Sequence, residues 1–332
     1  MKTFAFEHAG TVDGAVRSAT AGARYYAGGT NLLDLMKLGV ESPAALVDIG
    51  RLDLRSITPT EDGGVLVGAG ATNSATANHP LIRGQYPMLS QAILSGATTQ
   101  IRNMATVGGN LMQRTRCPYF MDPSFAHCNK RNPGSGCAAL QGFNREHALF
   151  GASAACVAVH PSDMAVALAA LDARLHVQGP EGHRLQRIDE FFALPGDTPV
   201  RDNTLRPGEL ITGIELPPSP LGPHSWYLKV RDRHSYAFAL VSVAAGVELA
   251  DGEIVAAALA LGGVAARPWR GAAAEASLIG SPAGDASFRA AAELITDGAA
   301  PLAQNGFKVD LARNSVVRAL RRAVPSNETL SS

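Results

Sequence analysis

The sequence lacks an excess of charge of either sign, and it lacks long apolar runs. Lys plus Arg number 29 and Asp plus Glu also number 29 among the 332 residues, so no net field would attract nucleic acid or an anionic membrane surface. No stretch approaches the roughly 18 uninterrupted apolar residues of a membrane-spanning helix, and the first residues do not form an export signal. We expect neither a nucleic-acid partner nor a membrane span.

Cysteine is also scarce, and its placement is uneven. The chain has 4 cysteines, all of which lie between positions 117 and 156: Cys117, Cys128, Cys137 and Cys156. Scattered structural cysteines would rarely gather in one short segment. The segment 113–156 is rich in Pro and Gly and shows no sustained periodicity. A loop of that length in a compact domain is usually functional or disordered, and the cysteines favour function.

Three kinds of cysteine chemistry compete for this segment. Two disulfides would suit a small secreted domain better than a chain with a large core. Zinc sites typically use closely spaced cysteine pairs, which are absent here. A cubane iron-sulfur cluster tolerates wide spacing if a loop wraps around it. His127 is an alternative ligand or a surface side chain, and basic residues that would offset cluster charge flank the cysteines: Arg114, Arg116, Lys130, Arg131 and Arg145.

The rest of the chain reads as an α+β protein with two or three domains. Residues 24–49 have the pattern strand, glycine turn, helix, strand. We predict a helix and a strand over 160–179, and an extended piece broken by two glycines over 101–111. Pro and Gly become dense before a boundary near residue 220, beyond which three strands precede helices near 271–279, 285–298 and 309–323.

Two double-glycine motifs could bind a ligand. Ala27-Gly28-Gly29-Thr30-Asn31 ends a strand and opens a helix, where backbone N–H groups can meet a phosphate. A plain turn is the alternative. Thr106-Val107-Gly108-Gly109-Asn110 offers a hydroxyl, amides and a side-chain amide, and its alternative interpretation is a glycine bulge in a strand.

Two charged residues also have a structural and a functional interpretation. Asp163 is a candidate N-cap of the following helix, as is Ser162, and Asp163 could also accept from a ligand hydroxyl. Lys229 and Arg231 alternate with apolar residues, which is typical of a solvated strand face. A cation facing a cofactor is the other hypothesis.

Taken together, AGGTNLLDLMK, ATVGGNL, CPYF with three further cysteines, HPSDMAVAL, KVRDRHSYAFALVSVAA and ALGGVAARPWR resemble the FAD subunits of molybdenum hydroxylases. The resemblance covers nearly the whole chain. It is strongest to the flavin subunit of periplasmic aldehyde oxidoreductases, whose loop after the second glycine motif carries a 4Fe-4S cluster. It implies a two-part FAD-binding domain of the vanillyl-alcohol-oxidase (PCMH) type over 1–220, with the 113–156 iron-sulfur loop inserted, and a C-terminal α+β domain of the CO dehydrogenase flavoprotein type over 221–332.

The resemblance also implies the residues of both sites. Those expected to bind FAD are Arg24, Tyr25, Tyr26, Ala27, Gly28, Gly29, Thr30, Asn31, Leu32, Thr106, Gly109, Asn110, Asp163, Ile211 and Lys229. Those expected to bind the cluster are Cys117, Cys128, Cys137 and Cys156. No acid, base or nucleophile needs a catalytic assignment.

The implied function is electron transfer within a heteromeric aldehyde oxidoreductase. A large molybdopterin subunit and a small 2Fe-2S subunit would supply electrons, and this chain would pass them through FAD to an external acceptor. The resemblance implies a periplasmic location through co-export with a signal-bearing partner, and the alternative is cytoplasmic. Two rival hypotheses are a self-contained flavin-dependent reductase and a non-catalytic module in which the cysteines hold zinc.

Overall fold

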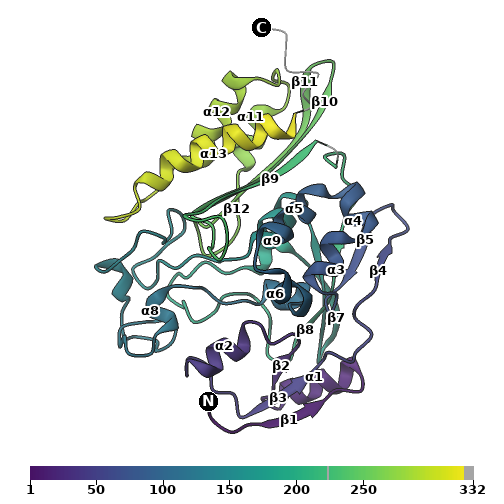
Figure 1. Cartoon of the computed structure of the whole chain (residues 1–332), viewed down its shortest axis with the longest axis vertical. Helices are drawn as coiled ribbons and strands as arrows, with labels where there is room; N and C mark the ends of the chain where they lie inside the picture. The colour runs from purple at the N-terminus through teal and green to yellow at the C-terminus, as the bar shows by residue number, and fades with distance from the viewer. Residues whose placement is uncertain (223, 325–332) are drawn as a thin grey trace.

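The computed structural model describes residues 1–222 and 224–324, which form three sheets and their covering helices (Figure 1). The predicted α+β architecture is confirmed, although the last residues of the expected C-terminal domain, 325–332, lie outside the described part. Within that part, no helix is both long and apolar enough to cross a bilayer.

The N-terminal region holds a small parallel sheet. Its strand order is β1 (Ala5–His8), β3 (Ala45–Asp48), β2 (Arg24–Tyr26). Helix α2 (Leu32–Lys37) connects β2 to β3, so residues 24–49 form the predicted strand–turn–helix–strand unit. Helix α1 (Val12–Thr20) joins β1 to β2 and is capped by the Thr11 hydroxyl, which accepts from the N–H of Gly14 at 3.0 Å.

A five-stranded antiparallel sheet forms the second part of the N-terminal region. Its order is β4 (Ile57–Pro59), β5 (Val65–Gly68), β8 (Leu210–Leu216), β6 (Arg174–Gly179), β7 (Gly182–Arg187). One face packs into the largest core, together with helices α3 (Asn73–Asn78), α4 (Pro80–Gln85), α5 (Pro87–Ser95) and α9 (Asp163–Ala170). The short helix α10 (Ile188–Phe191) follows β7.

The prediction of extended backbone over residues 101–111 is wrong. The structure forms α6 (Thr99–Met104) and α7 (Val107–Leu111) there. The Thr106 hydroxyl accepts from the N–H of Gly109 at 3.1 Å, so the second glycine motif begins a helix and is not a strand bulge. A local side-chain cap therefore outweighs the weak helix propensity of two glycines.

The C-terminal region is a four-stranded antiparallel sheet with helices on one face. Its order is β12 (Trp269–Arg270), β11 (Glu253–Gly262), β10 (Val241–Ala250), β9 (Ser225–Val230). On β10, Val243 and Ala245 point into the core shared with the C-terminal helices, whereas Ala244 joins the core of the N-terminal region. Because both faces are buried, residues 241–247 of this strand are apolar apart from Ser242. The covering helices are α11 (Ala272–Leu278), α12 (Asp285–Thr296) and α13 (Phe307–Ala323).

The cysteine segment runs along the side of the molecule between the two regions (Figure 1). Within residues 113–156 the structure assigns only α8 (Pro118–Met121) and the 3₁₀ turn η1 (Ala138–Leu140). The long loop predicted for this segment is confirmed. The segment begins beside the N-terminal region and ends against the C-terminal region, where the N–H of Leu149 donates to the carbonyl of Val264 at 2.7 Å.

Candidate functional site

The fold brings the two glycine motifs into contact. A Cβ atom added to Gly28 would collide with the backbone carbonyl of Met104, two residues before Thr106. Only glycine fits there, because the two chain segments approach each other without room for a side chain. Motifs separated by about eighty residues in the sequence therefore form one surface, as a shared ligand requires.

The first motif also presents an unpartnered donor. Gly29 has φ +71°, and Asn31 lies immediately before α2. The Oδ1 of Asn31 accepts from the N–H of Arg114 at 3.1 Å, which fixes the orientation of its amide. Its Nδ2 is buried and has no hydrogen-bond partner within the described residues. Buried donors are normally satisfied, so this atom fits a ligand that supplies an acceptor, such as a phosphate or hydroxyl oxygen.

The second motif lies beside the two charged residues that the sequence singled out, through the adjacent residues Ser162 and Asp163. The Ser162 hydroxyl donates to Oδ1 of Asn110 at 2.6 Å and also caps α9. The adjacent Asp163 accepts from Nζ of Lys229 at 2.8 Å and from the hydroxyl of Tyr227 at 2.7 Å. The structure thus confirms Ser162 as the N-cap and places Lys229 on a buried face of β9, so the solvated-face interpretation of Lys229 is wrong.

This ion pair joins the two regions of the chain. Asp163 starts α9 in the N-terminal region, whereas Lys229 and Tyr227 lie on β9 in the C-terminal region. The side chains of Lys229 and Asp163 are 4% and 7% exposed. Burial raises the pKa of Tyr227 well above its usual value, and the negative charge of Asp163 adds to the effect. Tyr227 therefore stays a hydrogen-bond donor to the carboxylate.

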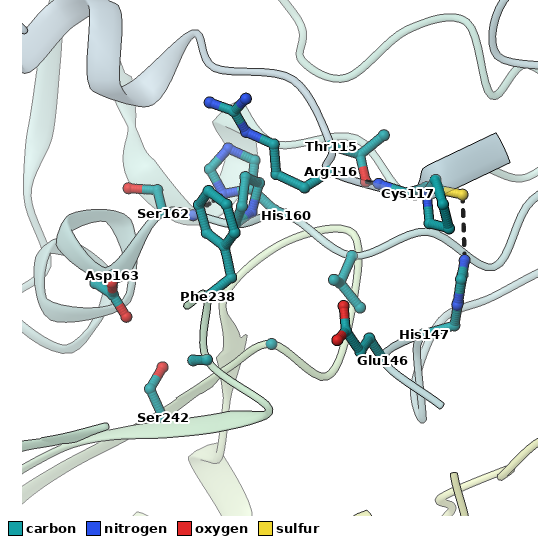
Figure 2. A pocket seen from close by; sticks show the side chains of 15 residues that line it. Thr115, Arg116, Cys117, Glu146, His147, His160, Ser162, Asp163, Phe238 and Ser242 are labelled. Carbon is teal, nitrogen blue, oxygen red and sulfur yellow. Dashed lines mark hydrogen bonds between the residues drawn. The ribbon is translucent and has the colours of Figure 1, made fainter. Parts of the chain in front are cut away.

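A cavity opens beside this network, between the two regions. Figure 2 shows Asp163 and Ser242 at one end, with Cys117 and His147 at the other. Arg116 stacks over the ring of Phe238, with 5.2 Å from its Cζ to the ring centroid. The cavity is lined by Thr115, Arg116, Cys117, Pro118, Glu146, His147, Val159, His160, Pro161, Ser162, Asp163, Phe238, Ala239, Ser242 and Gly263.

The four cysteines line a second, small cavity. None of them is in a disulfide, and Cys128 and Cys137 face each other in an isolated antiparallel bridge. Cys117 lines both cavities. The structure therefore gathers all four predicted metal ligands around one space.

Two of the thiols lie in surroundings that disfavour the charged thiolate. Burial raises the pKa of Cys117 to about 12, and neighbouring Cys156 and Cys128 add to the shift. Burial likewise raises the pKa of Cys156. Metal binding would have to displace these protons, which couples metal loading to folding of the segment. No group of three or more His, Cys, Asp or Glu side chains in the described ranges is arranged to hold a single metal ion. A cubane cluster is held differently, because each thiolate binds a different iron.

The basic residues around the cysteines are largely engaged elsewhere. Asp202 accepts from Arg114 at 2.7 Å and from Lys130 at 2.5 Å, so this buried network fastens the segment to the N-terminal region. Arg145 forms a bidentate pair with Asp232 at 2.8 and 2.9 Å. Nδ1 of His127 lies 2.7 Å from the carbonyl oxygen of Ser135. These contacts give most of the basic residues a structural role.

The other predicted cofactor residues lie around the first motif, with one exception. The hydroxyl of Tyr25 donates to the carbonyl of Gly208 at 2.7 Å. Burial raises the pKa of that hydroxyl to about 12. Ile211 lies in β8, and its side chain packs in the largest core. The remaining members lie in β2, directly after it or at the start of α2, and their cofactor role stays a prediction: Arg24, Tyr26, Ala27, Thr30 and Leu32.

Sequence reasoning missed three residues that the structure places beside the cysteines. Nε2 of His147 lies 3.2 Å from Sγ of Cys117. Lys308 and Asn305 are both 0% exposed and donate to the backbone of the cysteine segment. Burial lowers the pKa of Lys308 to about 7. Lys308 lies one residue before the helix predicted near 309–323, and its i, i+4, i+8 spacing to Ala312 and Val316 is the signal that could have revealed a buried lysine.

Comparison with known protein families assigns both regions of the chain. Residues 2–219 match the family described as "FAD binding domain in molybdopterin dehydrogenase", and residues 226–323 match "CO dehydrogenase flavoprotein C-terminal domain". Among curated proteins, the chain is 49% identical over 326 residues to the aldehyde oxidoreductase FAD-binding subunit PaoB of Escherichia coli K12, covering 97% of this chain and 99% of that protein. It is 27% identical to the carbon monoxide dehydrogenase medium chain of Afipia carboxidovorans, covering 91% and 88% of the two chains.

Solved structures share the fold. CO dehydrogenase from Oligotropha carboxidovorans matches with a TM-score of 0.76 at 22% identity, covering 97% of this chain and 98% of that chain. Quinoline 2-oxidoreductase from Pseudomonas putida 86 matches with a TM-score of 0.75 at 24% identity and the same coverage. The sequence matches and the shared fold show that this chain belongs to the FAD-binding subunits of the molybdenum hydroxylase family, a family of oxidoreductases.

Proposed function

We propose that this chain is the electron-transfer subunit of a heteromeric, molybdenum-dependent aldehyde oxidoreductase. Its bound FAD would pass electrons from molybdenum and 2Fe-2S centres in partner subunits to an external acceptor. The observation that carries the proposal is the 49% identity to PaoB over nearly the whole of both chains. We infer an aldehyde substrate from the name of that relative. The residues that contact the substrate would belong to a partner subunit.

The residues present fit FAD. The two glycine motifs lie side by side and expose backbone without side chains, which leaves room for a phosphate to approach the main chain. The buried Nδ2 of Asn31 is available to a phosphate or ribityl oxygen. Asn110 and Asp163 extend the surface, and Lys229 holds the carboxylate of Asp163 in place. We propose the fifteen predicted residues as the FAD site, with Ile211 as a core residue of β8 that supports it indirectly. The proposed domains are 1–220 and 221–332.

We further propose that Cys117, Cys128, Cys137 and Cys156 bind a 4Fe-4S cluster. Four free thiols lining one cavity support it. Zinc would need three or four of these thiols close around one ion. The cluster would hold together a segment that has almost no regular secondary structure of its own.

The proposed partners are a large molybdopterin subunit and a small 2Fe-2S subunit. Relatives named as a medium chain and as an FAD-binding subunit support such a division of labour. We propose a periplasmic location, reached by co-export with a partner that carries the signal. Detection of this chain in a periplasmic extract only when that partner's signal is intact would test the location.

The purified full chain tests the function. We expect flavin absorption bands, a broad iron-sulfur shoulder, and four iron and four sulfide per chain, which is the composition of one such cluster. The chain alone should not oxidise aldehydes. After chemical reduction, its flavin should reoxidise with an artificial acceptor.

Other outcomes would identify the rival hypotheses. Steady substrate turnover by the chain alone would indicate a self-contained flavoenzyme. Zinc in place of iron, without flavin, would indicate a non-catalytic metal-binding module. Flavin without iron would overturn only the cluster assignment.

A further inference from the structure

We propose that His147 donates its Nε2–H to the sulfur of Cys117 and thereby raises the reduction potential of the iron-sulfur cluster. We also infer that Asn305 and Lys308, from the C-terminal region, hold His147 in position for this bond. The inference rests on the proposed cluster. It assigns His147 as a positioning residue that acts on the cluster through a ligand.

The contact itself is close and enclosed. Nε2 of His147 lies 3.2 Å from Sγ of Cys117, and the dashed line in Figure 2 marks this contact. The histidine is 3% exposed. Among the described residues, His147 is the only side chain that contacts a cysteine sulfur at hydrogen-bonding distance. Backbone N–H groups also approach cysteine sulfurs: that of Ala158 lies 3.5 Å from Sγ of Cys156, and those of Tyr119 and Phe120 point toward the Cys117 thiol.

The chemistry of the ligand sets the direction of the hydrogen bond. A cysteine bound to iron is a thiolate, which carries no proton and can only accept. The imidazole must therefore carry its hydrogen on Nε2. Nδ1 of His147 is buried without a partner in the described part of the chain, so it suits the unprotonated nitrogen of a neutral ring. A hydrogen on Nδ1 would leave a buried donor unsatisfied.

The C-terminal region fixes the backbone on which His147 sits. The Nζ of Lys308 donates to the carbonyl of His147 at 2.8 Å and to that of Gly263 at 2.7 Å. The Nδ2 of Asn305 donates to the same His147 carbonyl at 3.0 Å and to Ala148 at 3.2 Å. Both donors are fully buried, so these bonds are shielded from water.

A second pair of bonds continues this junction. The N–H of Asn144 donates to Oε1 of Gln304, and the N–H of Gln304 donates to Oδ1 of Asn144, each at 3.1 Å. Residues 144–148 are thus held along residues 304–308, a range that includes the first two residues of α13. The position of the imidazole is set by the C-terminal region as well as by the cysteine segment.

The expected effect follows from charge. Reduction adds an electron to a cluster that four thiolates already make negative, and a donor to a ligand sulfur stabilises that added charge. Cys117 is the ligand that also lines the cavity beside Asp163. The hydrogen bond therefore acts on the cluster at the ligand that shares a cavity with Asp163 of the proposed flavin site.

Redox titration of the full chain, monitored by electron paramagnetic resonance, tests the inference. His147→Leu removes the donor, whereas His147→Gln keeps an N–H at a similar reach. We expect a lower cluster potential in His147→Leu and a potential near that of the native chain in His147→Gln. His127→Leu is the matched control, because His127 lies next to a ligand but contacts a carbonyl oxygen.

The outcomes separate this inference from the proposed function. A native chain without iron and sulfide overturns the cluster and the inference together. A native chain with a cluster and an unchanged potential in His147→Leu overturns the inference alone, as does an equal shift in both variants or loss of the cluster from both. A cluster lost from His147→Leu but held at the native potential by His147→Gln supports it, because the glutamine amide restores an N–H donor at this position.

Discussion

At the scale of single residues, Gly29 has a conformation that few other residues adopt. Its φ is +71°, and an added Cβ would lie 2.7 Å from Cε2 of Tyr26. We expect Gly29→Val to release FAD, because the branched side chain strains the backbone and displaces the motif. Flavin content per chain, measured by absorbance after gel filtration, checks the prediction.

Gly39 provides the matched control. It has φ +76°, but an added Cβ would meet nothing within 4 Å. Gly39→Val should therefore carry the same backbone strain and keep its flavin. Normal flavin content in Gly29→Val would return the first glycine motif to a plain turn.

His160 predicts how the stability of the chain depends on pH. Burial lowers its pKa to about 4, whereas an unfolded histidine titrates near 6.5. As pH falls from about 6.5 to 4 the unfolded state binds a proton that the native state does not, so stability is lost across this window. The shift corresponds to about 3 kcal/mol. Above pH 6.5 both states are neutral, and His160 contributes no pH dependence there.

Denaturant unfolding at pH 7.5 and pH 4.5 tests this interpretation. His160→Gln cannot take up a proton in either state, so it should lose less stability between the two pH values than the native chain. His183→Gln, at an exposed position of β7, is the control and should behave like the native chain. An equal loss in the native chain and in His160→Gln would contradict the prediction.

At the scale of elements, the cysteine segment depends on its ligands. Residues 113–156 contain only one short helix and one 3₁₀ turn, so few internal bonds hold them. We expect Cys128→Ser to remove iron and sulfide and to make the segment sensitive to protease, while FAD is retained. Iron analysis and limited proteolysis of the purified chain measure both effects.

Ser135 provides a control that distinguishes loss of the Cys128 thiol from a local disturbance of the loop. The hydroxyl of Ser135 accepts from the N–H of Cys128 at 3.0 Å. Ser135→Ala removes this bond and leaves every thiol in place, so it should keep its iron. Full iron and sulfide content in Cys128→Ser would show that Cys128 is not a ligand.

At the scale of the whole molecule, Lys229 and Asp163 hold the two regions together around the proposed flavin site. Removing one partner of a buried ion pair costs about 3–5 kcal/mol, because the other charge remains buried. In the complete complex, we expect Lys229→Ala to slow turnover with the final acceptor by disturbing flavin binding or potential. Steady-state rates and flavin content give the measurement.

The first half of the reaction should be unaffected by this change. Reduction of the molybdenum site by substrate under anaerobic single-turnover conditions precedes the flavin step, so its rate should match that of the native complex. Lys37→Ala, at an exposed position in α2, is the control. A slower molybdenum step in Lys229→Ala would place the defect in assembly of the complex and not in the flavin.

The sequence by itself determined the family and the α+β class, and it located the glycine motifs and the four clustered cysteines. Gly28, Gly29 and the four cysteines are recognisable because their chemistry is local, in backbone freedom or in a thiol. The helix that begins at Asp163 could also be predicted from the sequence, since capping and periodicity are short-range properties. The helix at Thr106 was not, because a single cap outweighed two glycines that suggested extended backbone.

Only the tertiary structure decided which distant residues meet. Gly28 packs against Met104, Lys229 pairs with Asp163, and Lys308 reaches the backbone of His147, although each pair is far apart along the chain. Burial then changes what these groups do: a lysine that alternation assigned to a solvated face becomes half of a buried ion pair. The physical reason is that hydrogen bonds and desolvation depend on neighbours in space, which periodicity along a chain does not encode.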